Sequence, residues 1–173
     1  MSYRALRGGA GGIAIVVAIV LIVALIAHGR KQDGQAGAPG GPTTARVVRV
    51  VDGDTIVASI GGSDEYVRYI GVDTPETVKP GTPVQCYGER ASRFNRHLVE
   101  GRTVRLVFDR ERRDRYGRLL AYVYLGHRFV NALLVRDGYA RTLTFYPNVA
   151  HAGLFARLAA AAGSDGRGLW GAC

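Results

Sequence analysis

Arg68 to Glu76, which reads R-Y-I-G-V-D-T-P-E, is the stretch from which the fold and the site are interpreted. Its first half is rich in aromatic and β-branched residues, which favour a half-buried strand. Pro75 has no N–H donor and keeps Thr74 out of the helical region, so the chain is expected to leave the sheet there. The strand therefore ends in two carboxylates, Asp73 and Glu76, on a rigid support.

Gly71 lies between the arginine and the first acid of this stretch. In a regular strand, alternation would place Arg68 and Asp73 on opposite faces. Glycine tolerates a bulge or a break, and a break at this position would bring both side chains to one side. The sequence thus predicts an interrupted strand that presents a cation and an acid to the same site.

The composition sets broad limits on the function. The chain has 173 residues and a formal net charge of +9, which allows one domain of ordinary size plus an appendage. A basic domain favours nucleic acid or an anionic membrane surface as partner, although a basic surface that only confers solubility is an alternative. Zinc is not expected, because the four histidines are dispersed without metal-ligand spacing: His28, His97, His127 and His151.

An apolar segment precedes the domain. Ile13 to Ala27 is an unbroken apolar run, and as a helix Ala10 to Ala27 would reach roughly 27 Å, just short of a hydrocarbon core of about 30 Å. We expect residues 1–9 to be a basic flank and residues 10–28 to be a transmembrane anchor or a cleaved signal segment, with a buried core helix as a third alternative. Either of the first two interpretations implies that the C-terminal domain is exported.

Residues 29–44 are rich in Gly and Pro and predict a flexible linker, and residues 45–173 predict one α+β domain. Two short strands between Arg46 and Ile60 flank an Asp-Gly-Asp hairpin signal at residues 52–54. The Arg68 strand comes after another turn. Further along, patterning predicts helices over Glu89–Glu100, Phe129–Asp137 and about 150–162, and strands over Thr103–Phe108 and Arg118–Leu125.

The order of these elements indicates the fold class. Five short antiparallel strands with a helix inserted after the third are typical of an OB-type barrel, a fold that often binds nucleic acid. We therefore predict a five-stranded antiparallel OB-fold-type barrel with about three helices, preceded by an N-terminal hydrophobic helix.

Five motifs in order resemble the thermonuclease, or staphylococcal-nuclease-like, family. They are V-D-G-D-T at 51–55, V-R-Y-I-G-V-D-T-P-E at 67–76, Y-G-E-R-A-S at 87–92, D-R-Y-G-R-L-L-A-Y at 114–122 and V-N-A-L-L-V-R-D-G-Y-A at 130–140. The resemblance covers about Ala45 to Trp170. It implies a barrel of the OB type that hydrolyses phosphodiester bonds in DNA and RNA.

The resemblance also implies a metal site. Asp54 and Asp73 would supply carboxylate ligands to a single Ca²⁺, and Thr74 would add its main-chain carbonyl. Calcium takes about six to eight oxygen ligands, so this set leaves positions for water and a phosphate oxygen. The residue types alone leave Mg²⁺ or Mn²⁺ open, and Asp54 and Asp73 could instead be a turn residue and a cap. Asp52 is either a support for this site or a plain turn residue.

Three further residues would act on the substrate according to the resemblance. Glu76 would orient or deprotonate the attacking water. Arg68 and Arg118 would contact the scissile phosphate, where two guanidinium groups stabilise the charge that builds in the transition state. The simpler alternative for both arginines is an ordinary position at a strand edge.

Substrate contacts are predicted on two segments. Arg115 and Tyr116 accompany Arg118 on a charged hairpin loop and suit phosphate contact and base stacking, with a merely solvated loop as the alternative. The family carries nucleotide-packing tyrosines before its last helix, whereas this chain reads T-L-T-F-Y-P-N at 142–148. Phe145 is predicted to contact substrate there, with Leu143 and Tyr146 as further approximate counterparts, and the base preference stays open.

Cys86 and Cys173 are the two cysteines of the chain. An even number of cysteines in an exported protein favours a disulfide, and two free thiols are the alternative.

Taken together, the sequence predicts an exported nuclease that prefers single-stranded DNA and RNA, and the family resemblance implies that it depends on calcium and leaves 3′-phosphoryl products. It is expected to be a monomer without an obligate protein partner, attached to the membrane through its N-terminal segment unless that segment is cleaved. The alternative is a non-catalytic nucleic-acid-binding module on the same barrel. A basic domain that only contacts lipid headgroups would not explain the acid cluster.

Overall fold

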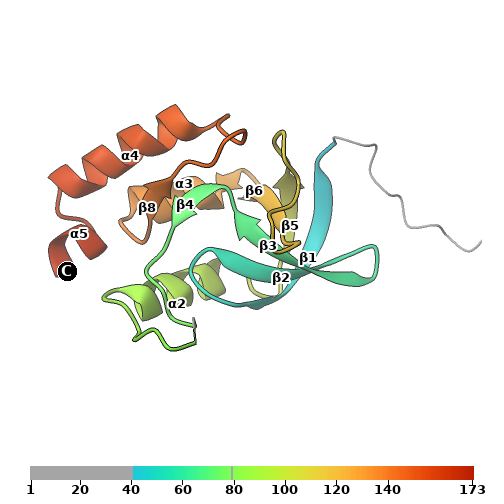
Figure 1. The fold of residues 1–173 in the computed structure, drawn as a ribbon, viewed down its shortest axis with the longest axis horizontal. Helices are drawn as coiled ribbons and strands as arrows, with labels where there is room; N and C mark the ends of the chain where they lie inside the picture. Colours follow the sequence, from blue (N-terminus) through green and yellow to red (C-terminus); the bar gives the residue numbers. More distant parts are fainter. Residues whose placement is uncertain (1–40, 79) are drawn as a thin grey trace, which may run out of the picture. The chain divides into compact units, whose positions relative to one another are not determined.

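The computed structural model describes residues 41–78 and 80–173 (Figure 1). The predicted basic flank at 1–9, the predicted membrane or signal segment at 10–28 and most of the predicted linker at 29–44 lie outside these residues. Within the part of the chain that is described, no helix has the length and apolar character needed to cross a membrane.

Three consecutive strands form the predicted antiparallel meander: β1 (Thr43–Val50), β2 (Thr55–Ile60) and β3 (Ser63–Tyr69). The first strand begins in the stretch predicted as linker, because Thr43 and Thr44 pair with Leu106 and Arg105 of β5 (Thr103–Val107). The barrel interior is filled by alternate residues of these strands, and Val47, Ile56 and Val67 are fully buried. Buried and exposed positions alternate along much of β1, as a sheet with one face on the core requires, whereas four successive residues of β2 are buried.

The closure of the barrel differs from the prediction. β5 pairs with β1 and with β6 (Leu119–Leu125), and the two-residue β7 (Arg128–Phe129) folds back to pair with the end of β6. β3 pairs with β6 in parallel over Leu119 to Ala121. In the row β3-β2-β1-β5-β6, neighbouring strands alternate in direction, so the first and fifth point the same way. An odd number of strands can therefore close only by one parallel pair. The predicted five-stranded OB-type barrel is confirmed, and its closing pair is parallel where antiparallel strands were expected.

The predicted interruption of the third strand is confirmed. β3 ends at Tyr69, and β4 (Gly71–Asp73) leaves the barrel to pair with β8 (Arg141–Leu143), a strand that was not predicted. Gly71 has a φ of +81°, and a Cβ atom at this position would lie 2.4 Å from the ring of Phe155. Only glycine combines this backbone conformation with this close approach.

The three predicted helices are present as α2 (Gly88–Val99), α3 (Val130–Arg136) and α4 (Ala152–Ser164), and a one-turn helix, α5 (Leu169–Ala172), comes after them. Figure 1 shows α2 below the strands β1 and β2, whereas α3 and α4 lie together on the side of β4 and β8. Phe155 of α4 and Leu134 of α3 are buried in the common core. The helices α3 and α4 therefore pack against β4, where the chain has left β3.

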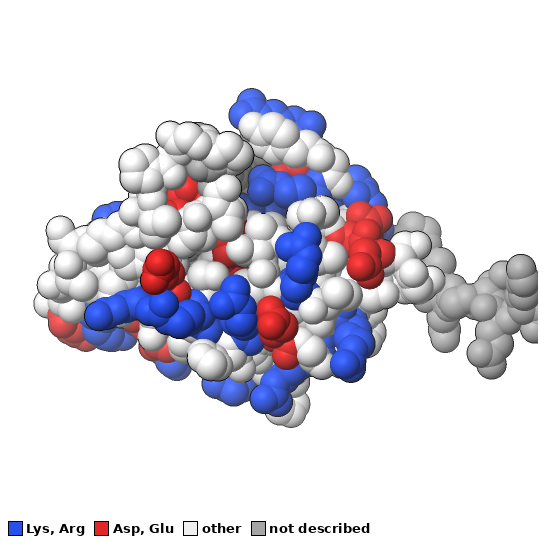
Figure 2. Space-filling model, turned by 90° about the horizontal axis from the view of Figure 1, so that it is seen from below, with Lys and Arg blue, Asp and Glu red and all other residues white. Residues whose placement is uncertain are grey.

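The surface of the domain is basic, as its charge requires. Figure 2 shows arginine side chains, with scattered acidic ones between them, on the face seen from below. The outer side of α2 contributes exposed arginines, namely Arg90, Arg93 and Arg96. Such a surface attracts polyanions.

Candidate active site

Arg68 is the centre of a partly buried charge cluster at the end of β3. Its Nη1 lies 2.7 Å from Oδ1 of Asp54, and its Nη2 lies 3.0 Å from Oδ1 of Asp73. Nη1 also donates a hydrogen bond to the carbonyl of Val72 at 3.0 Å. The interruption at Gly71 produces this arrangement, because it lets Asp73 turn back toward Arg68 instead of pointing to the opposite face.

Asp54 is held in place by Thr74, which lies twenty positions further along the chain. The N–H and the hydroxyl of Thr74 donate to Oδ2 of Asp54 at 2.7 and 3.0 Å. Gly53 permits this contact, since a Cβ atom there would lie 2.6 Å from the Thr74 hydroxyl oxygen. Thr74 was predicted only as a source of a main-chain carbonyl, and nothing in the sequence pointed to its side chain and N–H as partners of Asp54.

Opposing effects act on the pKa of the Asp54 carboxyl. Burial is the largest effect and raises the pKa of this carboxyl, whereas the charge of Arg68 and the hydrogen bonds from Thr74 act to lower it, so that the pKa rises from 3.8 to about 7 in all. The neighbouring charge of Asp52 adds to the rise. Asp52 also accepts a hydrogen bond from the N–H of Asp54 at 3.0 Å, so it is a turn residue that acts on the cluster as well.

Two carboxylates that share one guanidinium form a suitable environment for a metal cation. The guanidinium of Arg68 lies between the carboxylates of Asp54 and Asp73 and carries a single positive charge. The atoms that contact it are hard oxygens, which are the ligands that Ca²⁺ and Mg²⁺ prefer. Within residues 41–78 and 80–173 no group of three or more His, Cys, Asp or Glu side chains gathers for a metal. The predicted ligand set has only two such side chains, Asp54 and Asp73, together with the Thr74 carbonyl, and it stays a prediction.

Arg118 lies on the hairpin that precedes β6. Its Nε donates to Oδ2 of Asp114 at 2.7 Å, and its guanidinium carbon lies 5.5 Å from the ring centre of Tyr116. Arg115 contacts the same ring, with its guanidinium carbon 4.9 Å from the Tyr116 centre and its Nη2 bonded to the Tyr116 hydroxyl. Asp114 accepts the N–H groups of Tyr116 and Arg118, which fixes the turn.

Arg68 and Arg118 line one cavity of about 330 Å³. Its walls are the end of β3, the hairpin and the segment after β8. All three predicted substrate-binding residues belong to it: Arg115, Tyr116 and Phe145. Leu143 and Tyr146 line it too, and the residues Tyr116, Phe145 and Tyr146 are 67%, 61% and 85% exposed. Exposed aromatic rings beside guanidinium groups suit bases and phosphates of a nucleic acid strand.

Asn148 joins two walls of this cavity, and the sequence did not reveal it. Its side chain is buried, with Oδ1 accepting the N–H of Glu111 and Nδ2 donating to the Glu111 carbonyl, both at 2.8 Å. The segment that carries Phe145 is thereby fixed to the hairpin that carries Arg118. A contact between residues so far apart in sequence leaves no local pattern.

Glu76 begins the loop after the charge cluster. Its Oε1 accepts hydrogen bonds from the N–H groups of Thr77 and Val78, both at 2.8 Å. Its main chain is bonded to Gln85 in both directions, each at 2.9 Å. Glu76 is not among the described residues that line the cavity. The structure thus brings Arg68, Asp54, Asp73 and Thr74 into direct contact and places Glu76 on the adjoining loop.

A disulfide between Cys86 and Cys173 closes the far side of this loop. It joins residues 87 positions apart, with Cα atoms separated by 6.0 Å. In the loop-entropy account, a crosslink of this span contributes about 4–5 kcal/mol of stability. It attaches the end of α5 next to Gln85, the residue that holds the main chain of Glu76.

The fold and the site together define an OB-fold protein with an arginine–carboxylate centre beside an aromatic cavity. The family model for staphylococcal nuclease homologues matches residues 66–172, and the chain belongs to this family.

Individual relatives agree with this assignment. The chain is 55% identical over 102 residues to a thermonuclease of Staphylococcus intermedius, covering 59% of this chain and 61% of the relative. It is 50% identical over 105 residues to a thermonuclease of Staphylococcus hyicus, covering 61% and 62%. It is 45% identical over 124 residues to the endonuclease YncB of Bacillus subtilis, covering 70% and 59%. The chain thus matches about three fifths of the length of these relatives.

Proposed function

We propose that this protein is a calcium-dependent nuclease that hydrolyses phosphodiester bonds of DNA and RNA. The observation that carries the proposal is the position of Arg68, which contacts both Asp54 and Asp73 and lines the same cavity as Arg118. The family membership and the names of the relatives, thermonuclease and endonuclease, support the reaction class.

The chemical roles derive from the side chains. Arg68 and Arg118 bind the oxygens of the scissile phosphate and stabilise the charge that develops on them. Glu76 takes a proton from the attacking water, which forms a bond to phosphorus while the P–O5′ bond breaks. The 5′ oxygen takes up a proton from solvent, and the phosphate stays on the 3′ end. Calcium, held by Asp54, Asp73 and the Thr74 carbonyl, would neutralise negative charge on the phosphate.

Single strands are the preferred substrates under this proposal. Bases that are not paired can splay onto exposed aromatic rings, and base–aromatic stacking is worth about 1–3 kcal/mol per base. The rings of Tyr116 and Phe145 are exposed at the cavity and flank it from two segments. A stacked duplex offers no such access.

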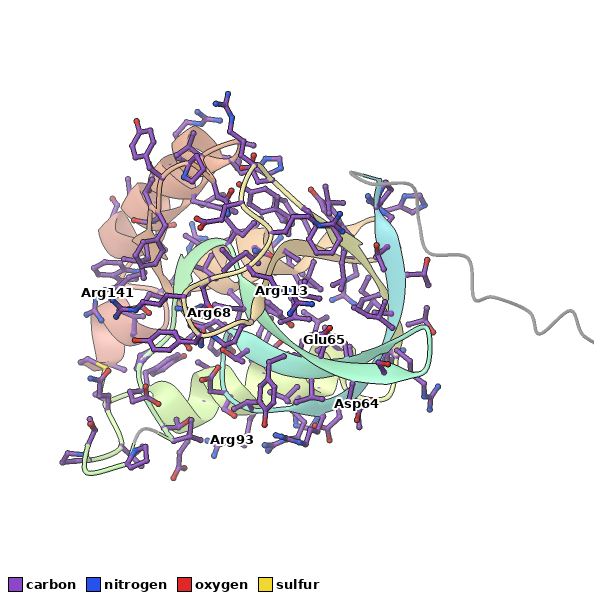
Figure 3. The ribbon with its side chains drawn as sticks, turned by 45° about the vertical axis from the view of Figure 1, so that its right-hand side comes forward. Asp64, Glu65, Arg68, Arg93, Arg113 and Arg141 are labelled. Carbon is purple, nitrogen blue, oxygen red and sulfur yellow. A yellow bond between two sulfur atoms is a disulfide. The ribbon has the colours of Figure 1, made fainter. Side chains whose placement is uncertain are left out.

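Calcium dependence is tested on heat-denatured DNA. Replacing Ca²⁺ by EGTA is expected to lower the rate at least about 100-fold, because the metal supplies several kcal/mol of charge stabilisation. Asp73→Asn is expected to weaken calcium binding at least about tenfold in calorimetry. Its side chain is 52% exposed, so the variant should fold. Asp64→Asn, an exposed site on β3 away from Arg68 in Figure 3, is the matched control.

The outcomes separate the alternatives. Undiminished cleavage in EGTA would contradict the calcium mechanism. Tight binding of the oligonucleotide by the calcium-loaded protein, without any cleavage, would favour the non-catalytic binding module.

We further propose that the domain acts outside the cytoplasm, attached through residues 10–28 or released after their cleavage. The apolar run supports this, and so does the disulfide, since such bonds persist in oxidising compartments. N-terminal sequencing of protein recovered from membranes and from the medium distinguishes an anchor from a cleaved signal. Recovery of the protein only from the cytoplasm, with both thiols reduced, would contradict export.

A further inference from the structure

Arg141 lies beside the charge cluster but was not part of the predicted site. It is the first residue of β8, and in the antiparallel pair of β4 and β8 it stands directly opposite Asp73. Residues opposite each other in such a pair project to the same side, with Cα atoms about 4.5–5.5 Å apart. Figure 3 shows Arg68 and Arg141 on the same side of the domain, next to β4. Arg141 therefore projects beside Asp73, the carboxylate that Arg68 contacts.

Within the described part of the chain, the guanidinium of Arg141 contacts an aromatic ring and forms no ion pair. Its central carbon lies 5.2 Å from the ring centre of Trp170, and the residue is exposed. Among residues 41–78 and 80–173 Arg141 has no carboxylate within ion-pair distance, whereas Arg113 and Arg118 are both paired. Stacking uses the flat face of a guanidinium and leaves its N–H edge available for a planar or tetrahedral anion.

Trp170 is held rigidly against the turn that leads into β8. The next residue towards the N-terminus, Leu169, is buried, and its N–H donates to the carbonyl of Gly138 at 2.8 Å. On the other side, Cys173 is bonded to Cys86. Trp170 is thus held from both directions. Because Arg141 packs on this fixed ring, it loses less conformational entropy when it binds a ligand than an arginine without such a contact would.

We propose that Arg141, supported by Trp170, binds a backbone phosphate of the substrate strand next to the scissile one. The inference rests on the proposed function, because a strand whose scissile phosphate binds Arg68 and Arg118 must continue past these residues. Arg141 lies next to them and has no acidic partner among the described residues. The ligand is a phosphodiester of a single nucleic acid strand. The simpler alternative is a structural role, in which Arg141 only fixes α5.

The test compares substrates with one phosphate and with many. For Arg141→Gln, the KM for a single-stranded 12-mer and the Kd from fluorescence anisotropy in EGTA should each rise about tenfold, equivalent to one lost ionic contact. The kcat should stay within about twofold, and hydrolysis of bis(p-nitrophenyl) phosphate should not change, because this compound has no flanking phosphate. The slope of log Kd against log salt should fall by about 0.7. Arg141→Lys, which keeps the charge, should restore most of the affinity.

Arg128→Gln is the matched control, because it makes the same change of charge at the first residue of β7. Arg128 pairs with Leu125, at the other end of β6 from the residues that pair with β3 beside the cavity. A strand of this length spans about 20 Å. An equal effect of Arg128→Gln would mean that only the net charge matters and would overturn the subsite.

Other results would overturn the proposal as well. Unchanged oligonucleotide affinity in Arg141→Gln would exclude the contact. An equal loss on bis(p-nitrophenyl) phosphate, or failure of Arg141→Lys to restore affinity, would assign a structural role instead. Because the anisotropy measurement needs no cleavage, a wild-type protein that binds the 12-mer without hydrolysing it would refute the nuclease function and still test Arg141. A wild-type protein that neither binds nor cleaves would refute both.

Discussion

Replacing Arg118 with alanine is expected to lower kcat on single-stranded DNA by about 10²–10³-fold, the usual cost of removing one preorganised donor from a transition state. Arg118 lines the cavity together with Arg68. Of its side-chain nitrogens only Nε has a hydrogen-bond partner among the described residues, namely Asp114. This bond fixes the plane of the guanidinium and leaves the terminal nitrogens for phosphate. The effect should fall on kcat more than on KM, because the phosphate gains charge only as the reaction proceeds.

The fold should tolerate this change. The Arg118 side chain is 32% exposed, and Asp114 keeps the N–H groups of Tyr116 and residue 118 as donors. Arg112→Ala is the matched control, because it removes a guanidinium from the same hairpin; this one packs on the ring of Phe108 and does not line the cavity. Steady-state kinetics on both variants measure the loss of kcat, and a melting curve shows whether each variant is folded. Wild-type kcat in Arg118→Ala, or an equal loss in Arg112→Ala, would refute the assignment of Arg118.

The course of the chain could largely be predicted because its signals are local. Turn residues, alternating strands and the apolar stripes of the helices are encoded by neighbours in sequence, and the interruption at Gly71 is signalled by a glycine between a cation and an acid. The way in which the barrel closes is not encoded by such local signals. Whether β3 meets β6 in parallel depends on the number of strands in the row, which no single segment encodes. β8 was missed because its three residues carry too short a pattern.

The site was predictable to a different extent. Motifs supplied the identities of Arg68, Asp54 and Arg118, but no motif describes how partners distant in sequence hold them. The hydrogen bonds from Thr74 to Asp54, the clamp of Asn148 on Glu111, and the position of Arg141 opposite Asp73 all depend on tertiary contacts. Such supporting residues become visible only when the chain is folded, because each is an ordinary polar residue in its own segment.

Glu76→Gln is expected to lower kcat by about 10²–10⁴-fold, the range of a lost general base, with little change in the affinity for an oligonucleotide. The substitution isolates the proton transfer. Oε1 of Glu76 accepts the N–H groups of Thr77 and Val78, and the amide oxygen of glutamine can accept the same two bonds, so the loop should keep its shape. The main-chain bonds to Gln85 are not touched by the change.

The matched control for this change is Glu89→Gln, which neutralises an exposed carboxylate paired with Arg93 on α2. Single-turnover cleavage of a 12-mer and anisotropy in EGTA separate chemistry from binding. A general base that titrates should also leave its mark on the pH–rate profile, whose acidic limb should be lost in Glu76→Gln and kept in Glu89→Gln. If Glu76→Gln cleaves at the wild-type rate while Arg118→Ala does not, the phosphate clamp stands and the proton must go to another acceptor. If both variants are fully active, the site lies elsewhere on the barrel.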